Sequence, residues 1–189
     1  MRTRYFLLMA AFFIISGLAL LVRGQQQARD TSSLIGEPDT TSLIGKPAPD
    51  FALTTIDGKD AKLASQKGHV VMVDFWATWC GPCRASLPHV QKVNASKDYA
   101  DKGLLVWAVN AQEDAATIKK FLDANKYTFA VPMDSAGATL GAYLVHGIPT
   151  TVIIGRNGNI ANVFIGFGGD DSAKAIDDAV EKALAESAS

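Results

Sequence analysis

The chain has 189 residues, of which 48% are hydrophobic and 20% are charged, and its formal net charge is -1. This composition is that of a globular protein with enough apolar residues for a sizeable core. The near-neutral net charge shows no basic excess of the kind that suggests nucleic-acid binding, so we expect no nucleic-acid partner.

An apolar segment lies close to the beginning of the chain. Arg2 and Arg4 precede an uncharged run of 18 residues, Tyr5–Val22. As a helix this run would be about 27 Å long, close to the roughly 30 Å of a bilayer's hydrocarbon core. It is either a cleaved signal peptide or an uncleaved membrane anchor. Because no A-x-A cleavage site follows Val22, we favour an anchor for residues 1–23, with the rest of the chain exported.

Residues 24–46 have the composition of a flexible tether. They are rich in Gln, Ser, Thr, Gly and Pro and contain few apolar residues. The sequence "SLIGEP" at 33–38 returns as "SLIGKP" at 42–47, which we interpret as a local duplication that lengthened the tether. The compact domain is then expected to span residues 47–189.

This domain alternates strand and helix patterns. Two near-continuous apolar runs are typical of strands buried on both faces, and three segments carry apolar residues at helical spacing. The elements predicted in the first half are a hairpin around Asp57-Gly58, strands at 69–77 and 104–110, a helix from Pro82 to Asn94 kinked at Pro88, and a helix from Glu113 to Asn125.

The second half of the domain ends in a hairpin and a helix. Asn157-Gly158 separates two strand-forming segments, which predicts a type I′ turn. The elements predicted here are a short strand at 129–133, helical turns around Leu140–Leu144, strands at 150–155 and 160–166, and a last helix that begins at Asp170 or Asp171. Together the elements predict a mixed α/β sheet with helices on both faces.

Cys80 and Cys83 are the only two cysteines. They lie where a buried strand gives way to a helix, with Pro82 suited to the first helical position. The free amides and positive dipole at a helix N-terminus favour a thiolate, the form that attacks disulfides. This position therefore favours a redox pair in which Cys80 is activated and Cys83 lies within reach.

A structural disulfide and a metal site are the two other interpretations of the cysteine pair. A disulfide that closes so short a loop gains little stability from chain entropy. A zinc site needs two further ligands, and His69, His89 and His146 lack ligand spacing. We expect these histidines at the surface or in loops, and we expect no bound metal.

Three motifs resemble one known family. "VDFWATWCGPC" at 73–83 resembles the active site of thioredoxin-fold thiol-disulfide oxidoreductases, and "GIPTTVII" at 147–154 resembles their proline loop. "IGKPAPDFAL" at 44–53 and the expected anchor resemble the membrane-tethered TlpA/ResA-type branch. The resemblance implies an α/β fold: a thioredoxin-like mixed sheet flanked by helices, with an N-terminal hairpin and a central insertion near 111–132.

The resemblance also implies a role for each site residue. Cys80 would be the exposed nucleophile and Cys83 the buried resolving thiol, linked as a redox disulfide in the oxidised enzyme. Asp74 stands where thioredoxins keep a buried aspartate, and we interpret it as the proton acceptor for Cys83. The residues expected to bind substrate are Trp79, Gly81, Pro82, Ile148 and Pro149, the last preceded by a cis peptide bond.

Two positions depart from the family. Ser86 replaces a glutamate that many members of the branch carry, and Ala108 replaces the lysine of thioredoxins. Without that cation, nothing in the sequence pairs with Asp74. We therefore expect burial to raise the pKa of Asp74.

These features predict an exported, membrane-tethered enzyme that reduces protein disulfides, such as those met in cytochrome c or copper-site maturation. We expect a single-pass protein of the bacterial inner membrane, a monomer with no cofactor and its catalytic domain in the periplasm. Its expected partners are an oxidised protein and a membrane thiol oxidoreductase that donates electrons. The alternatives are a peroxiredoxin-type thiol peroxidase and a non-enzymatic copper carrier.

Overall fold

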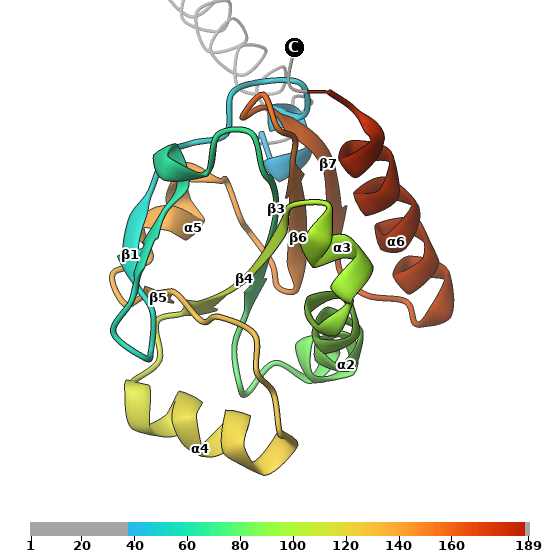
Figure 1. Cartoon of the computed structure of the whole chain (residues 1–189). Coiled ribbons are helices and arrows are strands. Elements are labelled where there is room, and N and C mark those ends of the chain that lie inside the picture. The colour runs from blue at the N-terminus through green and yellow to red at the C-terminus, as the bar shows by residue number, and fades with distance from the viewer. Residues whose placement is uncertain (1–37, 188–189) are drawn as a thin grey trace, which may run out of the picture. The chain divides into compact units, whose positions relative to one another are not determined.

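The computed structural model describes residues 38–187, which form a five-stranded sheet with helices on both faces (Figure 1). The order of the strands is β5-β4-β3-β6-β7. Their bounds are Val70–Trp76 for β3, Leu104–Ala111 for β4, Met133–Asp134 for β5, Thr150–Ile154 for β6 and Ile160–Ile165 for β7. β3 is parallel to β4 and antiparallel to β6, so the predicted mixed sheet is confirmed.

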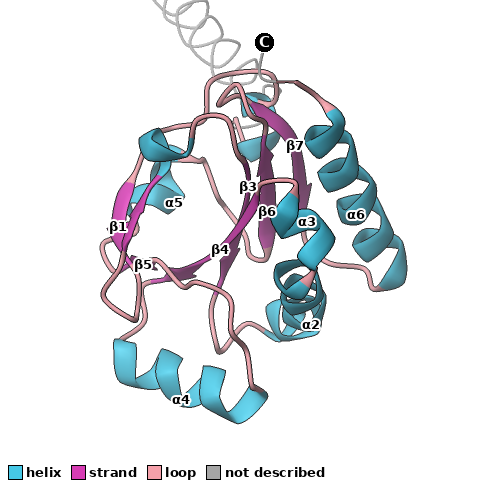
Figure 2. Ribbon diagram, in the orientation of Figure 1, coloured by secondary structure: helices cyan, strands magenta, loops and turns pink. Residues whose placement is uncertain are grey.

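The helices and a separate hairpin cover the two faces of this sheet (Figure 2). The helices are α2 (Gly81–Ala95), α3 (Lys97–Asp101), α4 (Ala115–Asn125), α5 (Ala138–Ala142) and α6 (Asp170–Ala185), and two 3-10 turns, η1 and η2, span Thr40–Leu43 and Leu63–Gln66. The hairpin consists of β1 (Ala52–Thr54) and β2 (Asp60–Lys62). It lies where the sequence predicted it, around Asp57-Gly58.

The central strand β3 is buried along its whole length. Side chains alternate between the two faces of a strand, and β3 divides its residues between two apolar clusters accordingly. Met72 and Trp76 belong to the cluster beneath α2 and α6, whereas Val73 and Phe75 belong to the cluster beneath β1 and α5. The same alternation turns Asp74 toward the face that carries α2.

The folded unit begins earlier than the sequence predicted. It starts at Pro38, because residues assigned to the tether pack on the domain. Thr40 is buried and its hydroxyl donates a hydrogen bond to the Leu144 carbonyl (3.0 Å), and the Gly45 amide donates to the Ile160 carbonyl (2.8 Å). The predicted anchor at 5–22 and the tether up to residue 37 lie outside the described residues. Within residues 38–187, no helix is long and apolar enough to cross a membrane.

Two predicted element boundaries were wrong. The helix expected from Glu113 begins at Ala115, because the Asp114 side chain caps it by accepting a hydrogen bond from the Thr117 amide (2.9 Å). Of the strand expected at 129–133, only Met133 lies in a strand, the two-residue β5 (Met133–Asp134). The short helix α3 was not predicted at all; with five residues it is too short to show an apolar period.

The turn between β6 and β7 and the environment of one histidine also differ from expectation. A type I′ turn requires positive φ at both central residues, but only Gly158 of the pair has it (φ 81°). His89 is buried rather than at the surface. Its Nε2 atom lies 3.3 Å from Oδ1 of Asp177 on α6, so it is part of the packing between α2 and α6.

Candidate active site

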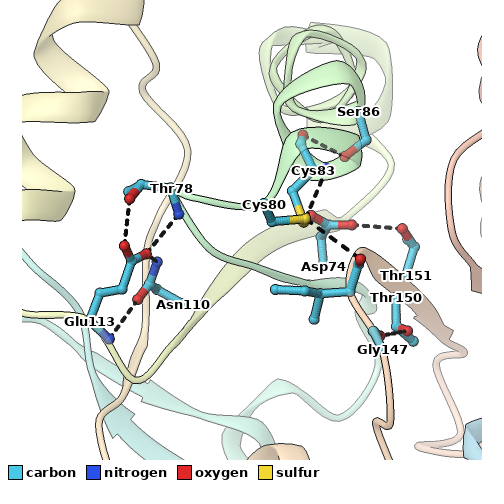
Figure 3. The surroundings of a disulfide bond; sticks show 11 residues. Asp74, Thr78, Cys80, Cys83, Ser86, Asn110, Glu113, Gly147, Thr150 and Thr151 are labelled. Atoms are coloured by element: carbon cyan, nitrogen blue, oxygen red, sulfur yellow. Dashed lines mark hydrogen bonds between the residues drawn. A yellow bond between two sulfur atoms is a disulfide. The ribbon is translucent and has the colours of Figure 1, made fainter.

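The two cysteines form a disulfide at the start of α2 (Figure 3). Cys80 is the N-cap residue of the helix, and its Sγ accepts a hydrogen bond from the Cys83 amide (3.1 Å). This amide is one of the free donors of the first helical turn. When the disulfide is reduced, the same donor and the helix dipole favour a thiolate at Cys80. The predicted position of Cys80 is confirmed, and Pro82 is the second helical residue rather than the first.

The two sulfur-bearing residues differ in access to solvent. Cys83 is fully buried, whereas Cys80 retains 5% of its surface. Cys80 is therefore less exposed than expected, but of the two it is the one that another molecule can reach. Trp79 beside it is 70% exposed. Ser86 is buried, and its hydroxyl donates a hydrogen bond to the Cys83 carbonyl (2.9 Å). It therefore provides a partner for this backbone carbonyl, but no carboxylate near Cys83 in place of the glutamate of other members.

The proline loop faces the disulfide from β6. The peptide bond between Ile148 and Pro149 is cis, as the resemblance implied. The Ile148 carbonyl oxygen lies 3.5 Å from Sγ of Cys80, and the Pro149 carbonyl accepts a hydrogen bond from the Gly166 amide (2.8 Å). Two motifs 68 residues apart therefore meet, with the backbone of Ile148 next to the sulfur of Cys80.

Asp74 lies beneath this pair, with none of its surface exposed. In Figure 3 its side chain points toward the cysteines. The Thr151 hydroxyl donates a hydrogen bond to Oδ1 (2.7 Å), while Oδ2 is buried with no partner among the described residues. Burial raises the pKa of Asp74 to about 7, although the hydrogen bond from Thr151 acts in the opposite direction. The expected rise is confirmed, and Asp74 is a group able to exchange a proton near neutral pH.

Thr151 is a partner that the sequence did not identify. It faces Asp74 because β3 and β6 pair antiparallel with these two residues in register. That register depends on how two segments separated by 77 positions meet. Once strand 150–155 is placed beside strand 69–77, the alternation of side chains leaves Thr151 as the hydroxyl next to Asp74.

Glu113 is a second residue that the sequence did not assign to the site. Its carboxylate accepts hydrogen bonds from the Thr78 amide (2.7 Å), the Thr78 hydroxyl and the Asn110 side-chain amide (2.8 Å). Figure 3 shows this group on the side of the loop away from Asp74. It joins the end of β4 to the loop that leads into Cys80, and so holds the segment that precedes the disulfide.

Comparison with known proteins agrees with this geometry. Residues 44–163 match the model of the AhpC/TSA family. The thioredoxin-like protein YneN of Bacillus subtilis is 39% identical over 122 residues, which are 63% of this chain and 69% of YneN. The thiol-disulfide oxidoreductase ResA of Geobacillus kaustophilus is 34% identical over 119 residues, 63% of this chain and 67% of ResA.

A solved structure gives the same result. A thiol:disulfide interchange protein of the thioredoxin family from Chlorobium tepidum superposes with a TM-score of 0.63 at 30% identity. The match covers 79% of this chain and 99% of that protein. The chain therefore belongs to the AhpC/TSA family and, within it, is a thioredoxin-fold thiol-disulfide oxidoreductase of the ResA type.

Proposed function

We propose that this enzyme is a membrane-tethered reductant of protein disulfides on the exported side of the bacterial inner membrane. The observation that carries the proposal is the unequal cysteine pair: Cys80, which keeps a small exposed surface, at the N-cap of α2, and the fully buried Cys83 a turn further along. Apocytochrome c and copper-site proteins are the substrates that the family resemblance suggests. The electrons come from a membrane thiol oxidoreductase, and the enzyme acts as a monomer.

The reaction proceeds by two thiol-disulfide exchanges. The Cys80 thiolate attacks one sulfur of the substrate disulfide, which forms a mixed disulfide and releases the other substrate sulfur as a thiolate. Cys83 then loses its proton and attacks Sγ of Cys80. The enzyme becomes the disulfide seen here, and the substrate gains two electrons and two protons. The membrane donor reverses the change by reducing Cys80-Cys83.

Asp74 serves the second exchange. Because Cys83 is fully buried, its proton has no direct route to solvent. The unpartnered Oδ2 of Asp74 is an acceptor beneath the pair, and a pKa of about 7 lets it take a proton and release it again near neutral pH.

The substrate binds around the attacked disulfide at Trp79, Gly81, Pro82 and Ile148. Pro149, also expected to bind substrate, is itself buried and takes part through the backbone of its loop. Trp79, Gly81 and Pro82 are exposed, and the Ile148 carbonyl borders Cys80. An extended segment laid along this backbone brings its own sulfur to Cys80, the less buried of the two cysteines.

The direction of the reaction is tested by redox equilibrium. The Gly-Pro pair between the cysteines resembles that of reductive thioredoxins. The reference potentials are about -270 mV for thioredoxin and about -120 mV for the oxidant DsbA. Equilibration with glutathione or dithiothreitol buffers should give a potential near the thioredoxin value, and the reduced enzyme should reduce insulin. A potential near that of DsbA would make the protein an oxidant and contradict the proposal.

The environment of Thr78 favours disulfide reduction over peroxide reduction. A peroxiredoxin-type site places a threonine hydroxyl beside the reactive thiol, in a Pro-x-x-x-Thr-x-x-Cys frame that this sequence lacks. The Thr78 hydroxyl instead donates to Glu113.

The predicted anchor is tested by fractionation of cells that produce the native chain. Tyr5–Val22 is long enough to span a bilayer, and no A-x-A cleavage site follows it. The protein should stay in the membrane pellet after a carbonate wash, with an N-terminus at or near Met1. Mature protein free in the periplasm and starting near Gln25 would show a cleaved signal peptide instead.

A further inference from the structure

A groove runs between α2 and α4, next to the disulfide. Its volume is about 1040 Å³, and its lining includes Thr78 and Gly81, on either side of Trp79 and Cys80 in the sequence. The groove, called here the α2–α4 groove, is lined by Thr78, Gly81, Arg84, Ala85, Pro88, Thr117, Lys120, Phe121, Ala124, Asn125 and Tyr127. It is separate from the proline loop, which borders Cys80 from the side of β6.

Both helices present the same pattern to this groove. On α2 the lining residues follow the spacing i, i+3, i+4, i+7 from Gly81, and on α4 they follow the same spacing from Thr117. Residues at this spacing share one helical face. The i+3 position is Arg84 on α2 and Lys120 on α4, so each wall carries one cation.

The two charged side chains that line the groove are both cations, although two carboxylates lie close to it: Thr78 donates a hydrogen bond to Glu113, and Thr117 donates one to Asp114. Among its lining residues no side chain is acidic, and within residues 38–187 neither Arg84 nor Lys120 takes part in an ion pair, although both are exposed. The neighbouring Lys119, by contrast, pairs with Asp123 (3.4 Å). The N-terminus of α2 adds a further positive end to the groove. A groove with two unpaired cations, in a chain of net charge -1, is complementary to an acidic ligand.

The groove also has an apolar side. Phe121 and Tyr127 are half-buried, with ring centroids 6.2 Å apart. Phe121 in turn packs on Trp76 of β3 (5.5 Å), so the ring is held by the core. Ala85, Pro88 and Ala124 leave the surface between the cations without large side chains. The shape suits an extended polypeptide rather than a compact polyanion.

We propose that the α2–α4 groove binds an acidic segment of the substrate protein, next to the cysteine that Cys80 attacks. The inference rests on the proposed function for the identity of the partner. The proline loop receives the substrate around its disulfide, and the chain continues past Gly81 into the groove. There Arg84 and Lys120 pair with its carboxylates and the two rings contact its apolar atoms. Such a site selects among disulfide substrates by the charge of their flanking sequence.

The kinetic test compares three disulfide peptides that differ only in flanking residues: glutamate, glutamine or lysine. The neutral 2-hydroxyethyl disulfide serves as a substrate without flanks. The variant R84Q/K120Q should lower kcat/KM for the glutamate peptide about five- to tenfold in 10 mM salt, as expected for two partly screened ion pairs. Its rate with 2-hydroxyethyl disulfide should not change. K119Q, one residue away on α4, is the matched control and should react like the wild type with all peptides.

The binding test does not depend on redox chemistry. A cysteine-free glutamate-rich peptide is titrated into the oxidised protein, and amide shifts are followed by NMR. The shifts should cluster at 81–88 and 117–127 and disappear in R84Q/K120Q and in 0.5 M salt. Equal rates for all three peptides would contradict the proposed binding of acidic segments in the groove. So would a K119Q variant that lowers the rate as much as R84Q/K120Q does. If the protein binds the peptide in the groove but reduces no disulfide, the binding proposal is supported and the proposed function is contradicted.

Discussion

Asp74→Asn should slow disulfide exchange by roughly ten- to a hundredfold near pH 7, a loss at or below the usual range for one general base. The variant keeps the size of the side chain and an oxygen for the Thr151 hydroxyl, but it cannot accept the Cys83 proton. In the wild type the rate should fall as pH drops below about 7, where the pKa of Asp74 lies and the carboxylate becomes protonated. The variant should lose this step in its pH profile. Stopped-flow measurement of insulin reduction from pH 6 to 9 checks both.

The same substitution should change stability in a pH-dependent way. Burial raises the pKa of Asp74 from 3.8 to about 7, so between these values the folded protein holds a proton that the unfolded chain has lost. Stability therefore falls as pH rises from about 4 to about 7 and is constant above, with a total on the order of 4 kcal/mol. Asparagine does not ionise, so the variant should not lose stability in this way as the pH rises. In urea unfolding of the oxidised protein, the variant should match the wild type at pH 4 and be clearly more stable at pH 8.

Thr151→Val is the control for Asp74. It keeps the carboxylate but removes the hydrogen bond that lowers the pKa, so its pH profile should shift to higher pH while activity at pH 9 remains.

An Asp74→Asn rate equal to that of the wild type across pH 6 to 9 would make Asp74 a structural residue. A large loss of stability at pH 8 would show that the ionised form is stabilised by the fold.

Cys83→Ser should stop the reaction at its midpoint. Cys80 can still attack, but no second thiol resolves the mixed disulfide, so the variant should stay covalently bound to the substrate protein. Cys80→Ser should form no such adduct, because its remaining thiol is fully buried. Non-reducing gel electrophoresis and mass spectrometry after incubation with oxidised insulin distinguish the two. Equal adduct yields from both variants would contradict the assigned roles.

Local sequence patterns predicted most of the fold. The apolar runs at β3 and β4 and the Asp57-Gly58 hairpin signal are each carried by a few consecutive residues, so they could be recognised without the tertiary structure. The two-residue strand β5 could not, because it depends on pairing with β4 at Asn110 and Ala111. Residues 38–46 are polar and read as a tether, but backbone hydrogen bonds to β7 and a buried threonine fix them to the domain.

The site was predictable where one segment carries its chemistry. The spacing of Cys80 and Cys83, at a predicted junction of strand and helix, is enough to predict a redox pair. The burial of Asp74 follows from its place in an apolar strand. Thr151 and Glu113 could not be assigned, because each acts on a residue far away in sequence through strand register or a loop contact. The low exposure of Cys80 is likewise a tertiary effect, since the Ile148 carbonyl, from the loop before β6, lies 3.5 Å from its sulfur.

Alkylation of the reduced native enzyme tests the central claim, that Cys80 is the activated thiol and Cys83 the resolving one. Iodoacetamide is added at a series of pH values, and peptide mass spectrometry reports the rate at each cysteine. Cys80 should react first by a wide margin, and its rate should approach a plateau well below pH 8.5, the region where an unperturbed cysteine titrates. Alkylation of Cys83 as fast as Cys80 would contradict the account.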